Sequence, residues 1–187
     1  MIPALDWLQN NAAHFGAANP AFFFWSSGTL SSVLDNAPTY LTFLSVDFGT
    51  FTPRDTAGGI AAYLNAHGAD LSAMASAPNA EQICRASLNL RAYFPQALSD
   101  GHFVPEQIQM AQALADPFQV KCLRAISIGS VFFGANTYIG NGPNFMVKAI
   151  ADQQKAHTPG FLSYVFRFTL PFMLPMLAIV WWCFFRT

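Results

Sequence analysis

The sequence predicts an all-α membrane protein, and its composition and its C-terminal segment are the two observations behind this prediction. Of the 187 residues, 53% are hydrophobic and 10% are charged, whereas a typical soluble domain has about 25% charged residues. The 25 residues from Phe161 to Phe185 are mainly apolar and carry one charge, Arg167, and about 20 such residues suffice to cross the hydrocarbon core of a bilayer. Prolines are tolerated in membrane helices, and the Trp181–Trp182 pair suits a membrane interface. We therefore expect a transmembrane helix over 161–186.

The same composition argues against several other classes of protein. A net charge of −1 gives no electrostatic basis for binding nucleic acid. The cysteines Cys84, Cys122 and Cys183 are too far apart to form a C-x-x-C pair, so neither a disulfide framework nor a zinc site is expected. No nucleophile and base stand at a usable spacing, so we predict neither an enzyme nor a bound cofactor.

Residues 1–20 are expected to form a lead-in loop or short helix, and a polar break interrupts the apolar stretch that follows. Residues 21–34 would form a helix roughly 21 Å long, which is too short to cross a membrane. The stretch Asp35–Pro38 then interrupts the pattern, and a second, shorter apolar arm follows. Two arms that cannot span predict a re-entrant helical hairpin over 21–49, which enters and leaves the membrane on one side. One continuous helix kinked at Pro38 is the alternative.

Residues 50–120 are polar and rich in proline, which predicts an extramembrane loop with short helices. A short amphipathic helix is predicted by the i, i+3, i+4, i+7 spacing of Ile60, Tyr63, Leu64 and His67. The stretch PEQIQMAQALADP, which starts at Pro105, has one proline suited to beginning a helix and another suited to ending it.

A second polar break predicts a broken transmembrane helix over 121–156. Apolar residues run from Leu123 to Ile139, and Gly140–Asn144 then interrupts them. Gly140 can end the helix behind it, and Pro143 is suited to begin the helix ahead.

Two breaks in one short chain predict a shared polar site. An unpaired backbone group in lipid costs several kcal/mol, so a broken helix survives only beside protein or a water-filled cavity. Secondary transporters use the carbonyl ends of broken helices to coordinate cations such as Na⁺. A charged residue at membrane depth is functional by default, which points to Asp35. The alternative role for Asp35 is an N-cap of the second arm.

Both breaks resemble segments of the ion transporter superfamily. LDNAPTYLTFL and TYIGNGPNFMVKAIA look very like signature segments of the group that includes citrate-transporter-like proteins, sodium/proton antiporters, arsenite-efflux pumps and divalent-anion/sodium symporters. The resemblance covers Phe22–Leu44 and Ala125–Ala151, with a fair match over the final helix. It is nearest to the branch of sodium:proton antiporters with a citrate-transporter-like domain, whereas residues 50–120 match no family that we can name.

The resemblance implies one half of an inverted-repeat transporter. In that superfamily each repeat supplies a re-entrant hairpin and a broken helix, and substrate and sodium bind between their tips. The candidate ion- or substrate-binding residues at the hairpin tip and at the partner break are then Asp35, Asn36, Ala37, Pro38, Thr39, Gly140, Asn141, Gly142, Pro143 and Asn144.

One departure from the family pattern favours cation exchange. The dicarboxylate symporters carry a Ser-Asn-Thr motif at the hairpin tip, and here the first position is Asp35. A fixed negative charge would repel a carboxylate substrate and attract a cation. We therefore expect sodium/proton antiport, with Na⁺ and H⁺ as the transported ions, Asp35 as the exchanging carboxylate, and Asn36 and Asn141 as further Na⁺ ligands.

The resemblance also implies what is missing from the chain. A complete member carries both repeats, so the expected partners are the lipid bilayer and an N-terminal repeat, with a homodimer as one candidate assembly. The expected location is the inner (plasma) membrane, as a multi-pass protein. The rival functions are a sodium-coupled carboxylate (citrate-like) or oxyanion transporter, and an inactive truncated membrane fragment.

Overall fold

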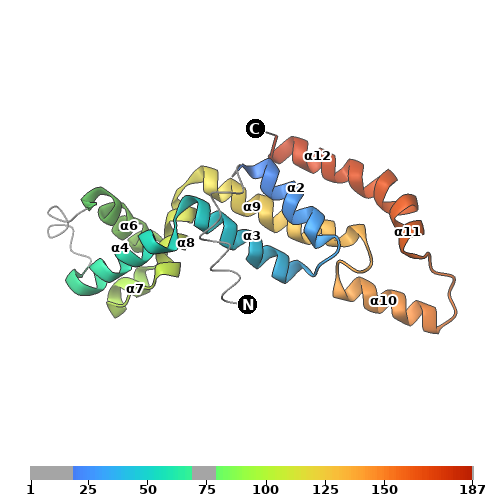
Figure 1. The fold of residues 1–187 in the computed structure, drawn as a ribbon, viewed down its shortest axis with the longest axis horizontal. Coiled ribbons are helices and arrows are strands. Elements are labelled where there is room, and N and C mark those ends of the chain that lie inside the picture. Colours follow the sequence, from blue (N-terminus) through green and yellow to red (C-terminus); the bar gives the residue numbers. More distant parts are fainter. Residues whose placement is uncertain (1–18, 69–78, 187) are drawn as a thin grey trace. The chain divides into compact units, whose positions relative to one another are not determined.

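In the computed structural model, which describes residues 19–68 and 79–186, the chain is helical and has no β-strand in those ranges (Figure 1). The prediction for 1–20 therefore lies almost entirely outside the described residues. The described chain forms two compact units. We call residues 19–44 and 121–186 the break unit, and residues 45–120 the bundle unit.

The first helix of the break unit is α2, Pro20–Ser31. The side chain of Asn19 caps it by accepting a hydrogen bond from the N–H of Phe22 at 2.7 Å, and Pro20 lies in its first turn. Its buried face carries two phenylalanines followed by three small residues, namely Phe23, Phe24, Ser27, Gly28 and Ser31. Small side chains on this face allow another helix to approach its backbone closely.

That second helix is α9, Pro117–Phe132, which continues into the 3₁₀ turn η2, Phe133–Asn136. A Cβ atom built on Gly129 would lie 2.5 Å from Ser27 Oγ and 2.7 Å from the carbonyl oxygen of Phe24. The ring of Phe133 likewise occupies the place of a Cβ on Gly28, at 2.5 Å. Glycine at both positions is therefore what brings α2 and the end of α9 together.

Both breaks lie a few residues earlier in the chain than the sequence predicts. The helix α3, Asn36–Phe51, already begins at Asn36, so the first break covers residues 32–35 and not Asp35–Pro38. The helix α10, Gly142–Gln153, begins at Gly142, so the second break covers residues 133–141. The reason is the same in both cases, because proline is compatible with the first turn of a helix and therefore starts α3 and α10 instead of interrupting them.

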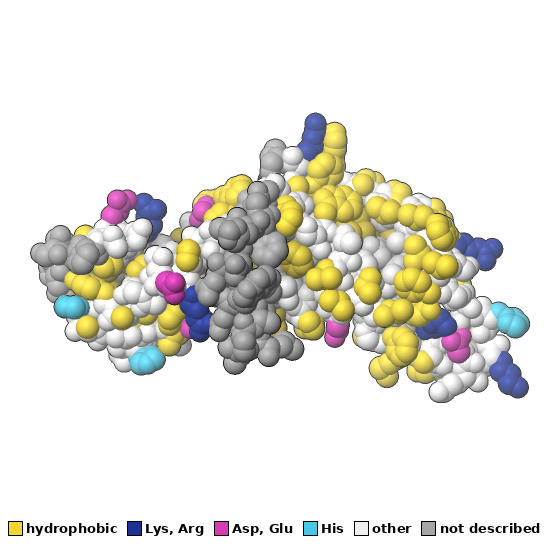
Figure 2. Space-filling model, viewed as in Figure 1, with side chains coloured by type: hydrophobic (Ala, Val, Ile, Leu, Met, Phe, Trp, Pro, Cys, Tyr) yellow, Lys and Arg dark blue, Asp and Glu magenta, His cyan; other side chains and the backbone are white. Residues whose placement is uncertain are grey.

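The C-terminal segment is one helical stretch of 24 residues, Phe161–Phe184, with a mean hydropathy of 1.6 in its most apolar window. It consists of α11 (Phe161–Tyr164), the π-helical η3 (Val165–Met173) and α12 (Leu174–Phe184). Pro171 lies within η3, and the N–H that proline lacks accounts for the widened turn. Figure 2 shows hydrophobic side chains gathered over α12, and among the described helices this is the stretch that is long and apolar enough to cross a membrane.

The bundle unit has a hydrophobic core of its own, built from short helices. Buried small and aliphatic side chains such as Ala57, Leu64, Leu90 and Ile108 form this core. The helices predicted around Ile60–His67 and from Pro105 are both present. The helices that lie wholly in this unit are α4 (Arg54–His67), α6 (Ala80–Tyr93), α7 (Pro95–Asp100) and α8 (Pro105–Ala115).

Candidate functional site

The side chain of Asn36 links the two breaks of the break unit. Its amide lies 2.8 Å from Ser31 Oγ, 2.8 Å from the carbonyl oxygen of Ser130 and 3.3 Å from the carbonyl oxygen of Gly140. Because carbonyl oxygens only accept, the NH₂ end of the amide lies on this side and donates to them. The hydroxyl of Ser31 in turn donates to the carbonyl of Ser130. One residue at the start of α3 is thus bonded to the end of α2, to α9 and to the second break.

Gly140 is packed directly against the first break. A Cβ atom on Gly140 would lie 2.6 Å from the carbonyl oxygen of Ser31 and 2.8 Å from that of Ser32. A Cβ atom on Gly134 would lie 2.6 Å from the side-chain amide of Asn36. These contacts are with backbone or with a constrained amide, so any larger residue would push the breaks apart.

A second set of hydrogen bonds fixes the irregular chain between η2 and α10. The hydroxyl of Thr137 donates to the carbonyl of Ser32 and accepts from the N–H of Gly140 at 3.0 Å. The amide of Asn136 donates to Ser32 Oγ at 3.2 Å. The carbonyl of Asn136 accepts from the buried hydroxyl of Thr169, which attaches the C-terminal helix to the same break. Two of the backbone groups freed by the second break, the N–H of Gly140 and the carbonyl of Asn136, are therefore satisfied by side chains of the same unit.

Asp35 lies at the edge of this network with its side chain exposed to solvent. Its carboxylate accepts from the N–H of Asn36 at 2.8 Å. Its carbonyl accepts from the N–H of Thr39 at 3.3 Å and from the hydroxyl of Thr39 at 3.0 Å. Asp35 therefore occupies the N-cap position of α3, as in its alternative role, although its carboxylate bonds the N–H of the first helical residue and not that of the second or third.

The remaining predicted residues divide between the site and its surroundings. Thr39 is buried and bonds only to the turn before it. Asn141 begins α10, and its carbonyl accepts from the N–H of Phe145 at 3.1 Å. The positions that the structure leaves outside the hydrogen-bond network among the described residues are Ala37, Pro38, Gly142, Pro143 and Asn144, of which all but the half-buried Asn144 are exposed.

Several residues of the site were missed by the sequence reasoning. Ser31, Ser130, Asn136, Thr137 and Thr169 are all buried polar residues within apolar helices or beside a break. The missed signal was their placement, because a hydroxyl or amide on the buried face of an apolar helix needs a hydrogen-bond partner.

The arrangement offers neutral oxygen atoms and no buried charge. Two of these atoms are unpaired: Ser130 Oγ and Asn136 Oδ1 are buried and have no hydrogen-bond partner among the described residues. Buried polar atoms are normally bonded, so these two oxygens are available to a further ligand such as water or a small cation. Neutral and carbonyl oxygens are ligands suited to hard cations.

Comparison with known families decides the class of protein. The profile of a family described as "Putative citrate transport" matches residues 1–185, nearly the whole chain. The chain belongs to this citrate-transport family. No curated protein and no solved structure matches the chain.

Membership of the citrate-transport family confirms the predicted resemblance to a citrate-transporter-like domain. It also supports a role in transport, which the break geometry suits independently. The profile also covers residues 50–120, which belong to the bundle unit and for which the sequence suggested no family.

Proposed function

We propose that this member of the citrate-transport family is the C-terminal part of a secondary transporter, with a Na⁺ site between the first break and the second. The observation behind this proposal is the Asn36 amide, which faces the carbonyl oxygens of Ser130 and Gly140. Without a cation, the NH₂ end satisfies these oxygens. When the amide rotates by a half-turn, Oδ1 faces the same two carbonyl oxygens. A cation can then bind among these oxygens in place of the two N–H groups.

The lengths of the helices suit a re-entrant hairpin. The helix α2 has 12 residues, about 18 Å at 1.5 Å per residue, which is less than the roughly 30 Å of a hydrocarbon core. The part of α3 that belongs to the break unit is shorter, since that unit ends at residue 44. In this proposal α2 and the start of α3 enter the inner membrane from one side, α11–α12 spans it, and the bundle unit lies outside the lipid. A second, N-terminal repeat would complete the substrate pathway.

Sodium/proton exchange is the mode of transport that we favour. The exposed carboxylate of Asp35 precedes the site and would raise the local concentration of cations while opposing a carboxylate substrate. The family description favours a second candidate, sodium-coupled transport of a citrate-like carboxylate. In that case the N-terminal ends of α3 and α10 would face the anion.

The two modes differ in what moves with sodium. Everted vesicles that carry the complete transporter and a pH-sensitive dye should report a pH change when sodium is added without any organic anion. Two results together would exclude exchange and support the second candidate. Uptake of radiolabelled citrate would depend on sodium, and adding sodium without citrate would cause no pH change.

Asp35→Asn tests the role of the exposed carboxylate in the same vesicles. We expect the apparent affinity for sodium to fall about fivefold, because a surface charge a few ångströms from the path is worth about 1 kcal/mol. An unchanged affinity would reduce Asp35 to a helix cap.

A further inference from the structure

A buried carboxyl group belongs to the bundle unit and is not among the residues proposed to bind sodium. Asp47, in the part of α3 that belongs to this unit, has 0% of its surface exposed. Its Oδ2 accepts a hydrogen bond from Gln119 Nε2 at 2.8 Å. Its Oδ1 is buried and has no hydrogen-bond partner among the described residues. One neutral donor is far too little to stabilise an ionised carboxylate in such a place.

The surroundings of Asp47 favour its neutral form. Burial raises the pKa of the Asp47 carboxyl from 3.8 to about 7, the hydrogen bond from Gln119 opposes this, and the nearby charge of Asp116 adds to it. The group therefore changes its protonation near neutral pH, although it lies beneath the surface. No described residue donates a hydrogen bond to Oδ1, so nothing on that side of the carboxyl compensates a negative charge.

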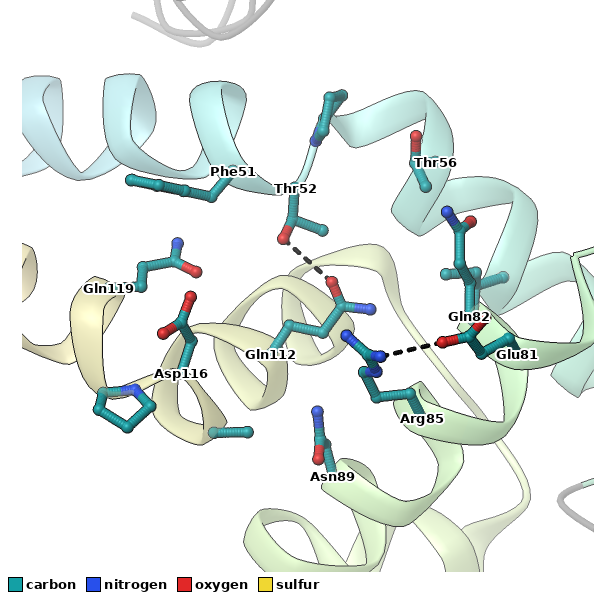
Figure 3. Close-up of a pocket in the computed structure, with 14 residues that line it drawn as sticks. Phe51, Thr52, Thr56, Glu81, Gln82, Arg85, Asn89, Gln112, Asp116 and Gln119 are labelled. Carbon is teal, nitrogen blue, oxygen red and sulfur yellow. Dashed lines mark hydrogen bonds and ion pairs between the residues drawn. The ribbon is translucent and has the colours of Figure 1, made fainter. Parts of the chain in front are cut away.

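A polar pocket of about 750 Å³ brings solvent to this pair. Figure 3 shows the side chains of Gln119 and Asp116 at one side of the pocket, with Thr52 and Gln112 beside them. Gln119 is itself 2% exposed, so it separates the pocket from Asp47. The wall from α6 is polar and the wall from α4 is mixed, with Thr56 and Ile60. The charged and amide side chains around the pocket make it accessible to water.

We propose that Asp47 is a proton-binding site, loaded with H⁺ from the water of this pocket past the side chain of Gln119. This proton site does not depend on the proposed transport function. It rests on the burial of Asp47, on its single hydrogen bond from Gln119 and on the unpaired Oδ1.

The proton site can be measured without transport. Infrared difference spectra of the purified chain between about pH 5 and about pH 9 should show a protonated-carboxyl band that disappears with a midpoint near neutrality, well above the ordinary pKa of an aspartate. We expect the band to be absent in Asp47→Asn and retained in the matched variant Asp35→Asn. A wild-type chain without the band, or a band that survives in Asp47→Asn, would overturn the proposal.

Gln119→Leu gives a second readout that does not depend on removing the carboxyl. Because the Gln119 hydrogen bond lowers the pKa of Asp47, its loss should move the midpoint of the band to higher pH. A midpoint that is unchanged or lower would contradict the assignment. This experiment involves no sodium, so its failure leaves the sodium site to its own test, and a failed sodium titration leaves the proton site standing.

Discussion

The contact between Gly140 and the first break gives the sharpest prediction about the break unit. In Gly140→Ala the new Cβ would lie 2.6 Å from the carbonyl oxygen of Ser31, and 3.4 Å is the lower limit of ordinary contact. Relief requires the chain to move by the difference, 3.4 − 2.6 = 0.8 Å. A shift of that size away from the first break would lengthen the 3.3 Å contact between the Asn36 amide and the Gly140 carbonyl beyond hydrogen-bonding distance.

The expected cost follows from these two effects. Overpacking costs about 1–3 kcal/mol and a lost hydrogen bond about 1 kcal/mol, so Gly140→Ala should lower the free energy of unfolding by about 2–4 kcal/mol. Gly142→Ala is a matched control, since a Cβ there meets no atom within 4 Å. It should be neutral or slightly stabilising.

Equilibrium unfolding of the purified chain in detergent, followed by circular dichroism, measures both variants. Equal free energies of unfolding for Gly140→Ala and Gly142→Ala would show that the two breaks do not touch, and the reasoning would fail.

Two further predictions concern helix packing and pH. Gly129→Ala should lower the free energy of unfolding by about 1–3 kcal/mol, because its Cβ would meet the Phe24 carbonyl oxygen at 2.7 Å. Gly58→Ala is the control and should not destabilise the chain, because a Cβ there meets nothing within 4 Å. Equal shifts in the thermal unfolding of the two variants would contradict this prediction. Because the pKa of Asp47 is about 7 in the folded chain and 3.8 in the ordinary case, the folded state holds an extra proton between these values. The free energy of unfolding should therefore fall by about 2–3 kcal/mol from about pH 5 to about pH 8, and level off above. Asp47→Asn should remove this slope in urea titrations, and a slope that persists would exclude Asp47 as its source.

The helices were predictable because local signals and tertiary packing agree. Asn19 and Pro20 fix the start of α2, and the apolar run from Phe161 fixes the long C-terminal helix. The bounds of the breaks were less predictable. Pro38 and Pro143 interrupt the apolar pattern but fit a first helical turn, so each break lies before its proline.

The composition of the site was only partly predictable. Asn36 and Gly140 were found because they stand in polar stretches that interrupt apolar ones. Ser130 and Thr169 lie inside apolar helices, where nothing local distinguishes a buried hydroxyl from one that faces lipid. The same limit holds for charged residues. Asp35 is an exposed cap, whereas Asp47 is buried and titrates near neutrality, and this difference in burial depends on tertiary packing.

Sodium binding to the break unit is the most direct test of the central claim. Equilibrium binding of radioactive sodium to the purified protein should be saturable, and Asn36→Leu should abolish it by removing the amide that faces the Ser130 and Gly140 carbonyls. Asn144→Leu is the matched control, because this half-buried asparagine lies in α10 and its side chain takes no part in the described network. The account predicts that Asn144→Leu binds sodium like the wild type. Equal binding by Asn36→Leu and the wild type, or no saturable binding in any variant, would contradict a cation site between the two breaks.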